Sequence, residues 1–166
     1  MTETPESLLA LWPQYQPTPL LPLPGLAKSV GVGMITIKNE GKRPLGSFKS
    51  LGGMYAGLRA LARHTGVATI SELVNTGPHG DLPPLVCASD GNHGLAVAAG
   101  AKLAGASSCI YLPAIVPQSR ANRILKEGGE VVRIDGTYED AVAAAANAAK
   151  RGEGILIADT TDLPDD

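Results

Sequence analysis

The sequence is poor in the residues that mark disulfide-rich and metal-binding proteins. Only two of its 166 residues are cysteine. Cys87 and Cys109 both lie in apolar, strand-like runs, where a free thiol behaves as a small hydrophobic side chain, so no disulfide is expected. The three histidines, His64, His79 and His93, do not have the spacing of metal ligands. We therefore expect no metal site.

The chain also lacks an excess of positive charge. Its 14 lysine and arginine residues face 16 aspartate and glutamate residues, which gives a formal net charge of -2 at pH 7. No basic field would attract nucleic acid or anionic lipid, so we expect neither as a partner. No apolar run is long enough to span a membrane, and the N-terminus MTETPESLLA lacks the basic and apolar regions of a signal peptide. A cytoplasmic protein is expected.

Two common nucleotide-binding motifs are missing as well. No GxGxxG follows a predicted strand, and GxxxxGK[ST] does not occur. Because these motifs present backbone N–H groups to phosphates, their absence argues against a Rossmann nucleotide-binding domain. Hydrophobic residues make up 44% of the chain and charged residues 18%, a composition typical of a globular protein with one core.

Proline is abundant at the N-terminus. Among the first 26 residues, positions 5, 13, 17, 19, 22 and 24 are proline. Proline fixes φ and removes a hydrogen-bond donor, so this stretch is predicted to be an extended arm lying on another surface. Leu20, Leu21, Leu23 and Leu26 are expected to pack there. A disordered tail is the alternative.

From Met34 onward the hydrophobic periodicity alternates between strand and helix. This pattern predicts an α/β protein with an open, mainly parallel sheet and helices on both faces. The predicted strands are 34–38, 85–88, 109–112, 131–134 and 155–158. The first predicted helix begins at Leu51 and ends before Gly66, and a short second helix begins at a capping pair of Thr69 and Glu72. Three further helices are predicted over residues 95–103, 118–127 and 138–150.

The alternation becomes regular at residue 85. We therefore predict that residues 1–84 form an N-terminal arm and the first part of a large domain. Residues 85–166 are predicted to form a smaller β-α-β-α-β-α-β domain, since short strands alternate there with helices of similar length.

One lysine lies in a segment unlike those of the other six. Lys49 occurs in GSFKSLGG, beside the only phenylalanine, Phe48, at the start of a predicted helix. A lysine that acts as a nucleophile or base needs desolvation or a nearby positive potential, and small and aromatic neighbours are compatible with this. The plainer alternative is a lysine whose amine extends from the helix start into water.

The segment ASDGNHG, which begins at residue 88, follows a predicted buried strand and opens a helix. Ligands collect at the carboxyl ends of parallel strands, where such turns present backbone N–H groups to anions. Ser89, Gly91 and Asn92 suit this role. His93 titrates near neutral pH, and Asp90 could act as a base. Taken singly, Ser89 or Asp90 could instead cap the helix, and His93 could be a buried structural residue.

Together, GSFK and SDGNHG resemble the pyridoxal 5'-phosphate (PLP) enzymes of fold type II, the tryptophan-synthase-β-like group. The resemblance implies that Lys49 forms the Schiff base with PLP. It places Phe48 beside the cofactor and Asn92 against the cofactor's ring oxygen. The residues that receive the substrate carboxylate would be Ser89, Gly91 and His93.

Within this family the sequence is most similar to diaminopropionate ammonia-lyases, and then to threonine dehydratase and serine racemase. FKSLGG, Asp90 and the run SRANRILKEGGEVVRIDGTYEDAV match the first group. Gly46-Ser47 has the dehydratase form, and Leu95-Ala96 replaces the usual polar-Gly pair, so the substrate stays open. The resemblance implies an α,β-elimination that converts an amino acid with a leaving group on Cβ into a 2-oxo acid and ammonia. Lys49 would remove the Cα proton, and Asp90 would be a second acid or base.

The resemblance covers roughly Lys38 to Asp162 and extends to the first half of the family's enzymes only. Their second half supplies a glycine-rich cup for the cofactor phosphate and a residue facing the pyridine nitrogen. We therefore expect the N-terminal half of a longer enzyme, a truncated product or one part of a split protein, with a homodimer partner or a complementing C-terminal chain. The alternative is a non-catalytic α/β module that binds a phosphorylated small ligand or a partner chain through residues 89–94.

Overall fold

The computed structural model describes residues 4, 8, 9, 11, 16–76 and 81–160. The α/β part is built on a four-stranded sheet with the strand order β5-β4-β3-β6, in which all neighbouring strands are parallel. The strands are β3 (Leu85–Ala88), β4 (Ser108–Pro113), β5 (Glu130–Ile134) and β6 (Ile155–Leu156). The predicted parallel α/β architecture is therefore confirmed, with strand bounds that differ by a few residues.

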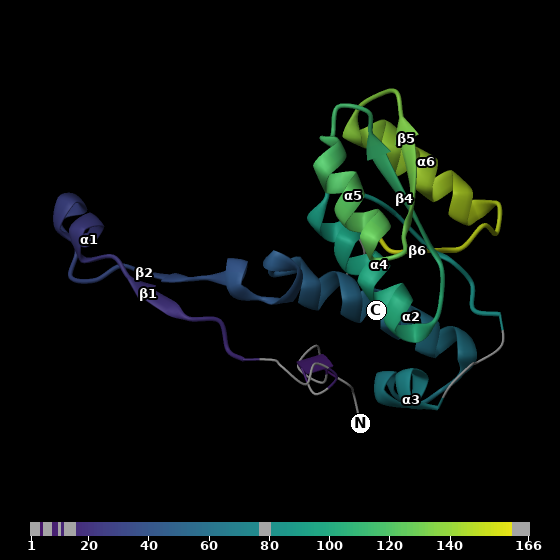
Figure 1. Cartoon of the computed structure of the whole chain (residues 1–166), viewed down its shortest axis with the longest axis horizontal. Coiled ribbons are helices and arrows are strands. Elements are labelled where there is room, and N and C mark those ends of the chain that lie inside the picture. The colour runs from purple at the N-terminus through teal and green to yellow at the C-terminus, as the bar shows by residue number, and fades with distance from the viewer. Residues whose placement is uncertain (1–3, 5–7, 10, 12–15, 77–80, 161–166) are drawn as a thin grey trace.

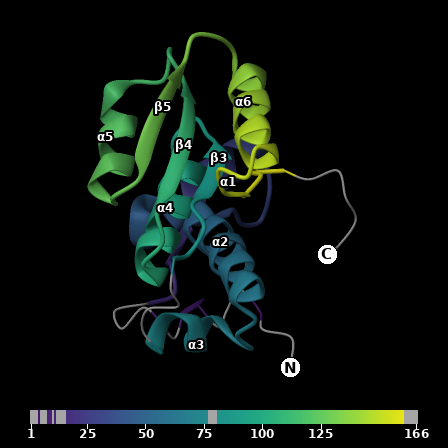
Figure 2. The same ribbon diagram turned by 90° about the vertical axis from the view of Figure 1, so that its right-hand side faces the viewer.

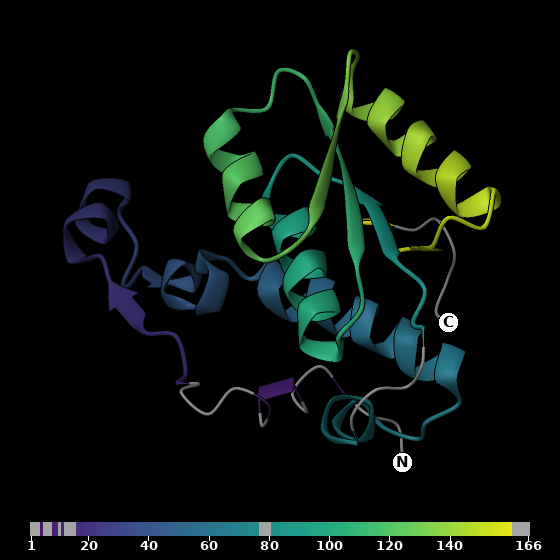
Figure 3. The same cartoon turned by 45° about the vertical axis from the view of Figure 1, so that its right-hand side comes forward.

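Helices cover both faces of this sheet. They are α2 (Lys49–Thr65), α3 (Ile70–Asn75), α4 (Asn92–Ala104), α5 (Gln118–Lys126) and α6 (Tyr138–Lys150). Figures 2 and 3 show α5 and α4 on one face and α6 on the other. Strand β3 is buried along its whole length because both of its faces are covered, which explains its uninterrupted apolar sequence LVCA.

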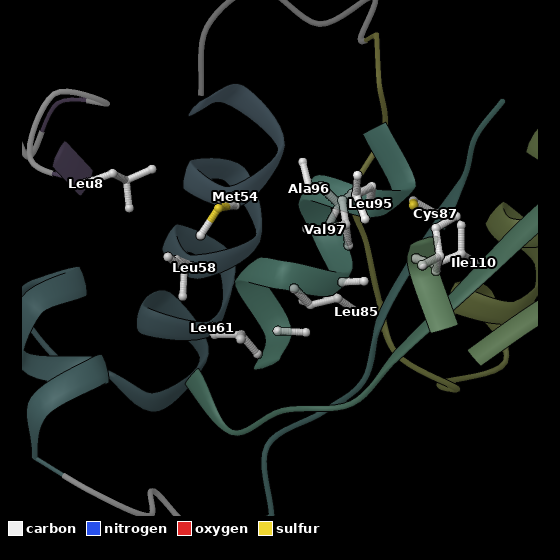
Figure 4. Packing of buried hydrophobic residues seen from close by; sticks show 14 of the residues in the cluster. Leu8, Met54, Leu58, Leu61, Leu85, Cys87, Leu95, Ala96, Val97 and Ile110 are labelled. Carbon is white, nitrogen blue, oxygen red and sulfur yellow. The ribbon is translucent and has the colours of Figure 1, made fainter. Parts of the chain in front are cut away.

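The larger core lies between α2, α4 and the sheet. Leu58, Leu85 and Ile110 are fully buried in it (Figure 4). Helices α2 and α4 approach closely because glycines lie between them: a Cβ added at Gly53 would lie 2.8 Å from the Cβ of Ala96. The opposite face of the sheet packs Val86 and Ala88 against the alanines of α6.

Helix ends follow the local sequence. Thr137 and Asp140 form a complete capping box at the start of α6, as the spacing predicts. At α3 the Thr69 hydroxyl accepts a hydrogen bond from the N–H of Glu72, whereas the Glu72 carboxylate accepts one from the N–H of Ala68. The second half of that predicted capping box is therefore displaced by one residue.

The N-terminal region differs from the sequence-based prediction. The predicted strand at 34–38 is shortened to β2 (Thr36–Lys38) and pairs antiparallel with β1 (Leu20–Pro22), outside the main sheet. Between them lies α1 (Pro24–Val30), where an extended arm was predicted. Pro24 occupies a first-turn position that tolerates its missing N–H, and Gly31 ends the helix in the left-handed conformation with φ 73°.

We call residues 18–38, which contain β1, α1 and β2, the N-terminal ribbon. In Figures 1 and 3 it projects away from the α/β part. Leu20, Leu21 and Leu26 are 64%, 42% and 48% exposed, so these leucines do not pack on the described part of the chain as was predicted. The predicted proline-rich stretch before Gln16 lies largely outside the described residues.

Two short 3-10 turns join the ribbon to α2. They are η2 (Glu40–Lys42) and η3 (Pro44–Gly46). Leu45 has φ 64° and is the only non-glycine residue with positive φ among those that the structure describes. The chain therefore enters α2, and reaches Lys49, through a conformation that L-amino acids rarely adopt.

Candidate active site

The predicted site residues meet in one cavity of about 660 Å³ at the carboxyl ends of β3 and β6. Phe48 and Lys49 reach this place from the start of α2, and the others come from the loop between β3 and α4 and from the first turn of α4. The predicted residues that line the cavity are Phe48, Lys49, Ser89, Asp90, Gly91, Asn92 and His93. Two segments far apart in sequence are therefore brought together as the paired motifs predicted.

The Lys49 amine points into the fold rather than into water. Its Nζ contacts Oδ1 of Asp159, which follows β6, and the side chain of Lys49 is 28% exposed. The Phe48 ring lies 5.5 Å from the same Nζ and is itself largely exposed. Helix α2 begins at Lys49, two residues before the predicted start at Leu51. The amine is therefore held by a carboxylate and an aromatic face, within reach of a ligand in the cavity.

His93 lies beneath the cavity on the first turn of α4. Its Nε2 is 2.8 Å from the carbonyl oxygen of Ile157, and its Nδ1 is 3.5 Å from Oδ1 of Asp159. Burial lowers the pKa of His93, an effect that the Ile157 carbonyl and the Asp159 carboxylate oppose in part. A neutral ring that donates its Nε2–H to Ile157 leaves Nδ1 as an acceptor facing the lysine and the carboxylate.

Ser89 shapes the loop between β3 and α4. Its hydroxyl oxygen accepts hydrogen bonds from the N–H groups of Gly91 and Gly94, at 2.9 and 2.8 Å, and the side chain is buried. Gly91 has φ 146°, a conformation that favours glycine, and a Cβ at Gly94 would lie 2.5 Å from Ile110. This tight turn leaves Asp90 and Asn92 exposed at the cavity.

Five further residues line the cavity that the two motifs do not contain. They are Arg120, Arg123, Tyr138, Asp159 and Thr160, and Gly46 of the first motif lines the cavity as well. Asp159 could have been found from the sequence, because it is the first charged residue after the predicted strand ILIA and so belongs to the same sheet edge as Ser89. The arginines and Tyr138 carried no comparable signal.

Tyr138 is the first residue of α6. Burial raises the pKa of its hydroxyl, and the carboxylates of Asp159 and Asp90 raise it further. The phenol therefore stays protonated at neutral pH and offers the cavity an O–H donor.

Residues 11–166 match the family model described as pyridoxal-phosphate dependent enzyme. The chain belongs to this family. PLP is accordingly the family's cofactor, and the cavity fits it chemically: a lysine amine, an aromatic ring and an exposed asparagine face one space at a helix start. The predicted family and fold are both confirmed.

Individual relatives agree with this family assignment. The diaminopropionate ammonia-lyase of Escherichia coli K12 is 36% identical over 149 residues, which are 88% of this chain and 37% of the relative. The threonine synthase of a Synechocystis species is 33% identical over 127 residues, which are 75% of this chain and 29% of that protein. Among solved structures, the holo form of the Escherichia coli diaminopropionate ammonia-lyase superposes with a TM-score of 0.84 and 31% identity, over 95% of this chain and 41% of that chain. The chain thus spans well under half the length of these relatives.

Proposed function

We propose that this chain is part of a PLP-dependent lyase that removes ammonia from an amino acid with a leaving group on Cβ, in the manner of a diaminopropionate ammonia-lyase of cytoplasmic amino-acid catabolism. One observation carries the proposal: Lys49 and the SDGNHG loop, which are separated by forty positions of sequence, line a single cavity. The similarity to diaminopropionate ammonia-lyases over 88% of the chain supports the choice of reaction.

The cavity residues divide into three tasks. Lys49 attaches the cofactor and exchanges the Cα proton of the substrate, with Phe48 against the same side of the site. Asn92 binds the cofactor ring. The loop residues Ser89, Gly91 and His93 form the carboxylate-binding turn, in which Ser89 and His93 act from below by fixing the loop.

When bound, PLP supplies the electron sink that makes loss of the Cα proton feasible. Asp90 lies on the exposed rim of the cavity and can give a proton to an amine that leaves from Cβ, or act on the opposite face of Cα. Asp159 keeps the Lys49 side chain in the cavity through their ion pair. Loss of the leaving group and hydrolysis then release a 2-oxo acid and ammonia.

We further propose that residues 1–84 belong to an arm and the beginning of a large domain, that residues 85–166 form the small domain, and that residues outside these 166 complete the site. The N-terminal ribbon supports this, because its apolar side chains are exposed along both strands. We favour residues that correspond to the remaining length of the relatives, whether they continue this chain or form a complementing one, and a second copy of this chain is the alternative.

Covalent trapping tests the proposal. The chain is incubated with PLP, reduced with borohydride and digested, and the modified peptide is identified by mass spectrometry. We expect the pyridoxyl mass on Lys49 and its loss in Lys49→Ala. Lys102→Ala is the matched control, since Lys102 lies on α4 outside the cavity and pairs with Glu127. Modification spread over exposed lysines with no preference for Lys49 would contradict the proposal and favour a non-catalytic α/β module.

A substrate comparison separates the ammonia-lyase from a dehydratase. The reconstituted enzyme is given 2,3-diaminopropionate, serine and threonine, and the 2-oxo acid is measured. We expect faster turnover of diaminopropionate, and we expect Asp90→Asn to reduce elimination strongly while PLP attachment is kept. Preference for threonine would instead support the dehydratase alternative, for which a threonine dehydratase of Corynebacterium glutamicum, 32% identical over 144 residues, is a relative.

A further inference from the structure

Helix α5 directs two arginines at the cavity. Arg120 and Arg123 are three positions apart and so lie on the same side of the helix. The neighbouring Ala121 and Ile124 are fully buried, which anchors the helix to the core. The starting points of both arginine side chains are therefore fixed, although their guanidinium groups extend over the surface.

Arg120 binds the loop that follows β3. Its Nη1 donates a hydrogen bond of 2.8 Å to the carbonyl oxygen of Asp90. The aliphatic part of the same side chain covers the next residue: a Cβ added at Gly91 would lie 3.0 Å from Cδ of Arg120. One side chain thus fixes the carbonyl of Asp90 and closes the space beside Gly91, where φ is 146°.

Arg123 binds the segment that precedes Lys49. Its Nη2 donates a hydrogen bond of 2.7 Å to the carbonyl oxygen of Leu45. Leu45 has the positive φ noted above, a conformation that is costly for a residue with a Cβ and persists only where the surroundings hold it. Hydrogen bonds from a charged donor are stronger than neutral ones, so this contact is suited to hold it.

We propose that Arg120 and Arg123 are positioning residues, which we call the arginine clamp: one helix sets the relative position of the lysine segment and of the substrate-carboxylate loop. Arg123 fixes residues 44–48 and thereby the direction in which Lys49 enters the cavity. Arg120 fixes residues 89–92 and adds a positive charge beside the loop that is proposed to receive the substrate carboxylate. The roles of the two segments rest on the proposed function, whereas the clamp itself rests on the contacts.

Amide hydrogen exchange in the 166-residue chain without PLP tests the clamp. In Arg120→Gln the amides of Gly91 and Gly94 should exchange about tenfold faster, as expected for loss of one charge-assisted hydrogen bond, while that of Gly46 is unchanged. In Arg123→Gln the pattern should be reversed. The amide of Leu85, which bonds the Ser107 carbonyl in the core, reports global opening.

Each variant has controls. Arg120→Lys and Arg123→Lys keep a cationic donor and should recover part of the protection. Arg63→Gln removes the same charge from the exposed side of α2 and should change none of these amides. Equal acceleration of exchange at Gly46, Gly91 and Leu85 in either glutamine variant would show that the arginine only stabilises the fold. No acceleration in the segment that the replaced arginine contacts would show that the arginine does not fix that segment. Either result overturns the clamp.

Attachment of PLP adds a second readout in the same variants. Arg123→Gln should slow borohydride-trapped attachment at Lys49 about tenfold, and Arg120→Gln should slow it less, because Arg120 acts on the loop that carries Asn92 and not on the lysine segment. Equal rates for the two variants would overturn the assignment. If the parent chain takes no PLP on Lys49, the proposed function fails, and the exchange pattern still decides whether the clamp exists.

Discussion

Two side chains from different segments, Lys49 and His93, approach the same carboxylate oxygen of Asp159. Oδ1 of Asp159 contacts Nζ of Lys49, which lies 110 positions earlier, and approaches Nδ1 of His93 at 3.5 Å. All three side chains are at least partly withdrawn from water, with exposures of 25%, 28% and 5% in that order. The charge of the lysine is thereby balanced inside the cavity, and the histidine is left uncharged beside it.

The buried histidine predicts a pH-dependent loss of stability. Its pKa is lowered in the folded chain, whereas the unfolded chain has the ordinary value of 6.5. As the pH falls through 6.5 the unfolded state binds the proton first, so the free energy of unfolding should decrease by up to about 1.4 kcal/mol per pH unit until the folded value is reached. Urea unfolding of the chain between pH 7.5 and pH 5 measures this decrease.

Two variants check its origin. His93→Gln removes the titrating ring and should flatten the pH dependence below 6.5, at the cost of some stability at pH 7.5. His64→Gln removes a histidine from the exposed side of α2 and is the matched control. An unchanged slope in His93→Gln would show that other groups cause the loss.

At the level of elements, α2 and α4 touch through small residues. The adjacent glycines of GSFKSLGG face opposite ways: Gly52 is exposed, with nothing within 4 Å of an added Cβ, while Gly53 is buried against Ala96. Farther along the pair, a Cβ at Gly100 would lie 3.2 Å from Cα of Met54. The position of α2, which carries Lys49, therefore depends on the small residues that allow α4 to pack closely against it.

This packing predicts opposite effects for two neighbouring substitutions. Gly52→Ala should raise the free energy of unfolding by about 0.5–1 kcal/mol, since it removes a flexible residue from a helix without a contact. Gly53→Ala should lower it by about 1–3 kcal/mol, because the new methyl group forces the helices apart. Chemical denaturation of both variants under the same conditions measures the difference, and effects of equal sign would contradict the packing described above.

The elements after residue 85 were predictable because each carries its own signal. Strands β3 and β4 are short apolar runs, and α6 has a capping box, so local sequence decides their type. Helix α1 was missed because the density of prolines in the first 26 residues dominated the prediction, although Pro24 stands where a helix accepts proline. The placement of β2 was missed because periodicity identifies a strand but not its partner.

The same reasoning explains what could be predicted of the site. Lys49 and the loop after β3 are recognisable because their chemistry is concentrated in two short motifs. The ion pair between Lys49 and Asp159 depends on β6 lying next to β3, which the sequence does not specify. Arg120 and Arg123 bind backbone carbonyl groups, and since every residue has one, the sequence does not identify these partners. The domain boundary between residues 84 and 85 stays a prediction.

For the molecule as a whole, the N-terminal ribbon is the described part that is held by the fewest tertiary contacts. Backbone pairing holds β1 to β2, and Lys38 donates a hydrogen bond of 2.6 Å to the carbonyl oxygen of Thr18. A two-stranded ribbon of this kind is marginally stable by itself, and both of its outer edges are open. Most of the large hydrophobic side chains that are exposed in the described residues belong to it: Leu20, Leu21, Leu26, Val30, Val32, Met34 and Ile37.

We expect the chain without a partner to bind an apolar fluorescent dye and to associate as its concentration rises. Replacing Leu20 and Met34, the two most exposed of these side chains, together by threonine should reduce both effects. Ile115→Thr removes an 88% exposed apolar side chain outside the ribbon and serves as the control. Dye fluorescence and sedimentation velocity are the measurements. Equal dye fluorescence and equal association of the ribbon variant and the parent chain would show that the ribbon is not the surface that binds the dye and mediates association.

The position of β3 in the interior of the sheet has a consequence for the time at which the site comes into being during synthesis. Leu85 pairs with Ser108 on one side and with Ile155 on the other. A nascent chain that has emerged only as far as α6 can form the first pairing but not the second, and Asp159 is not yet available to Lys49. Contacts of such long sequence separation form slowly. Lys49 is therefore synthesised 110 residues before its carboxylate partner, and throughout that interval of translation its amine cannot form the ion pair with Asp159.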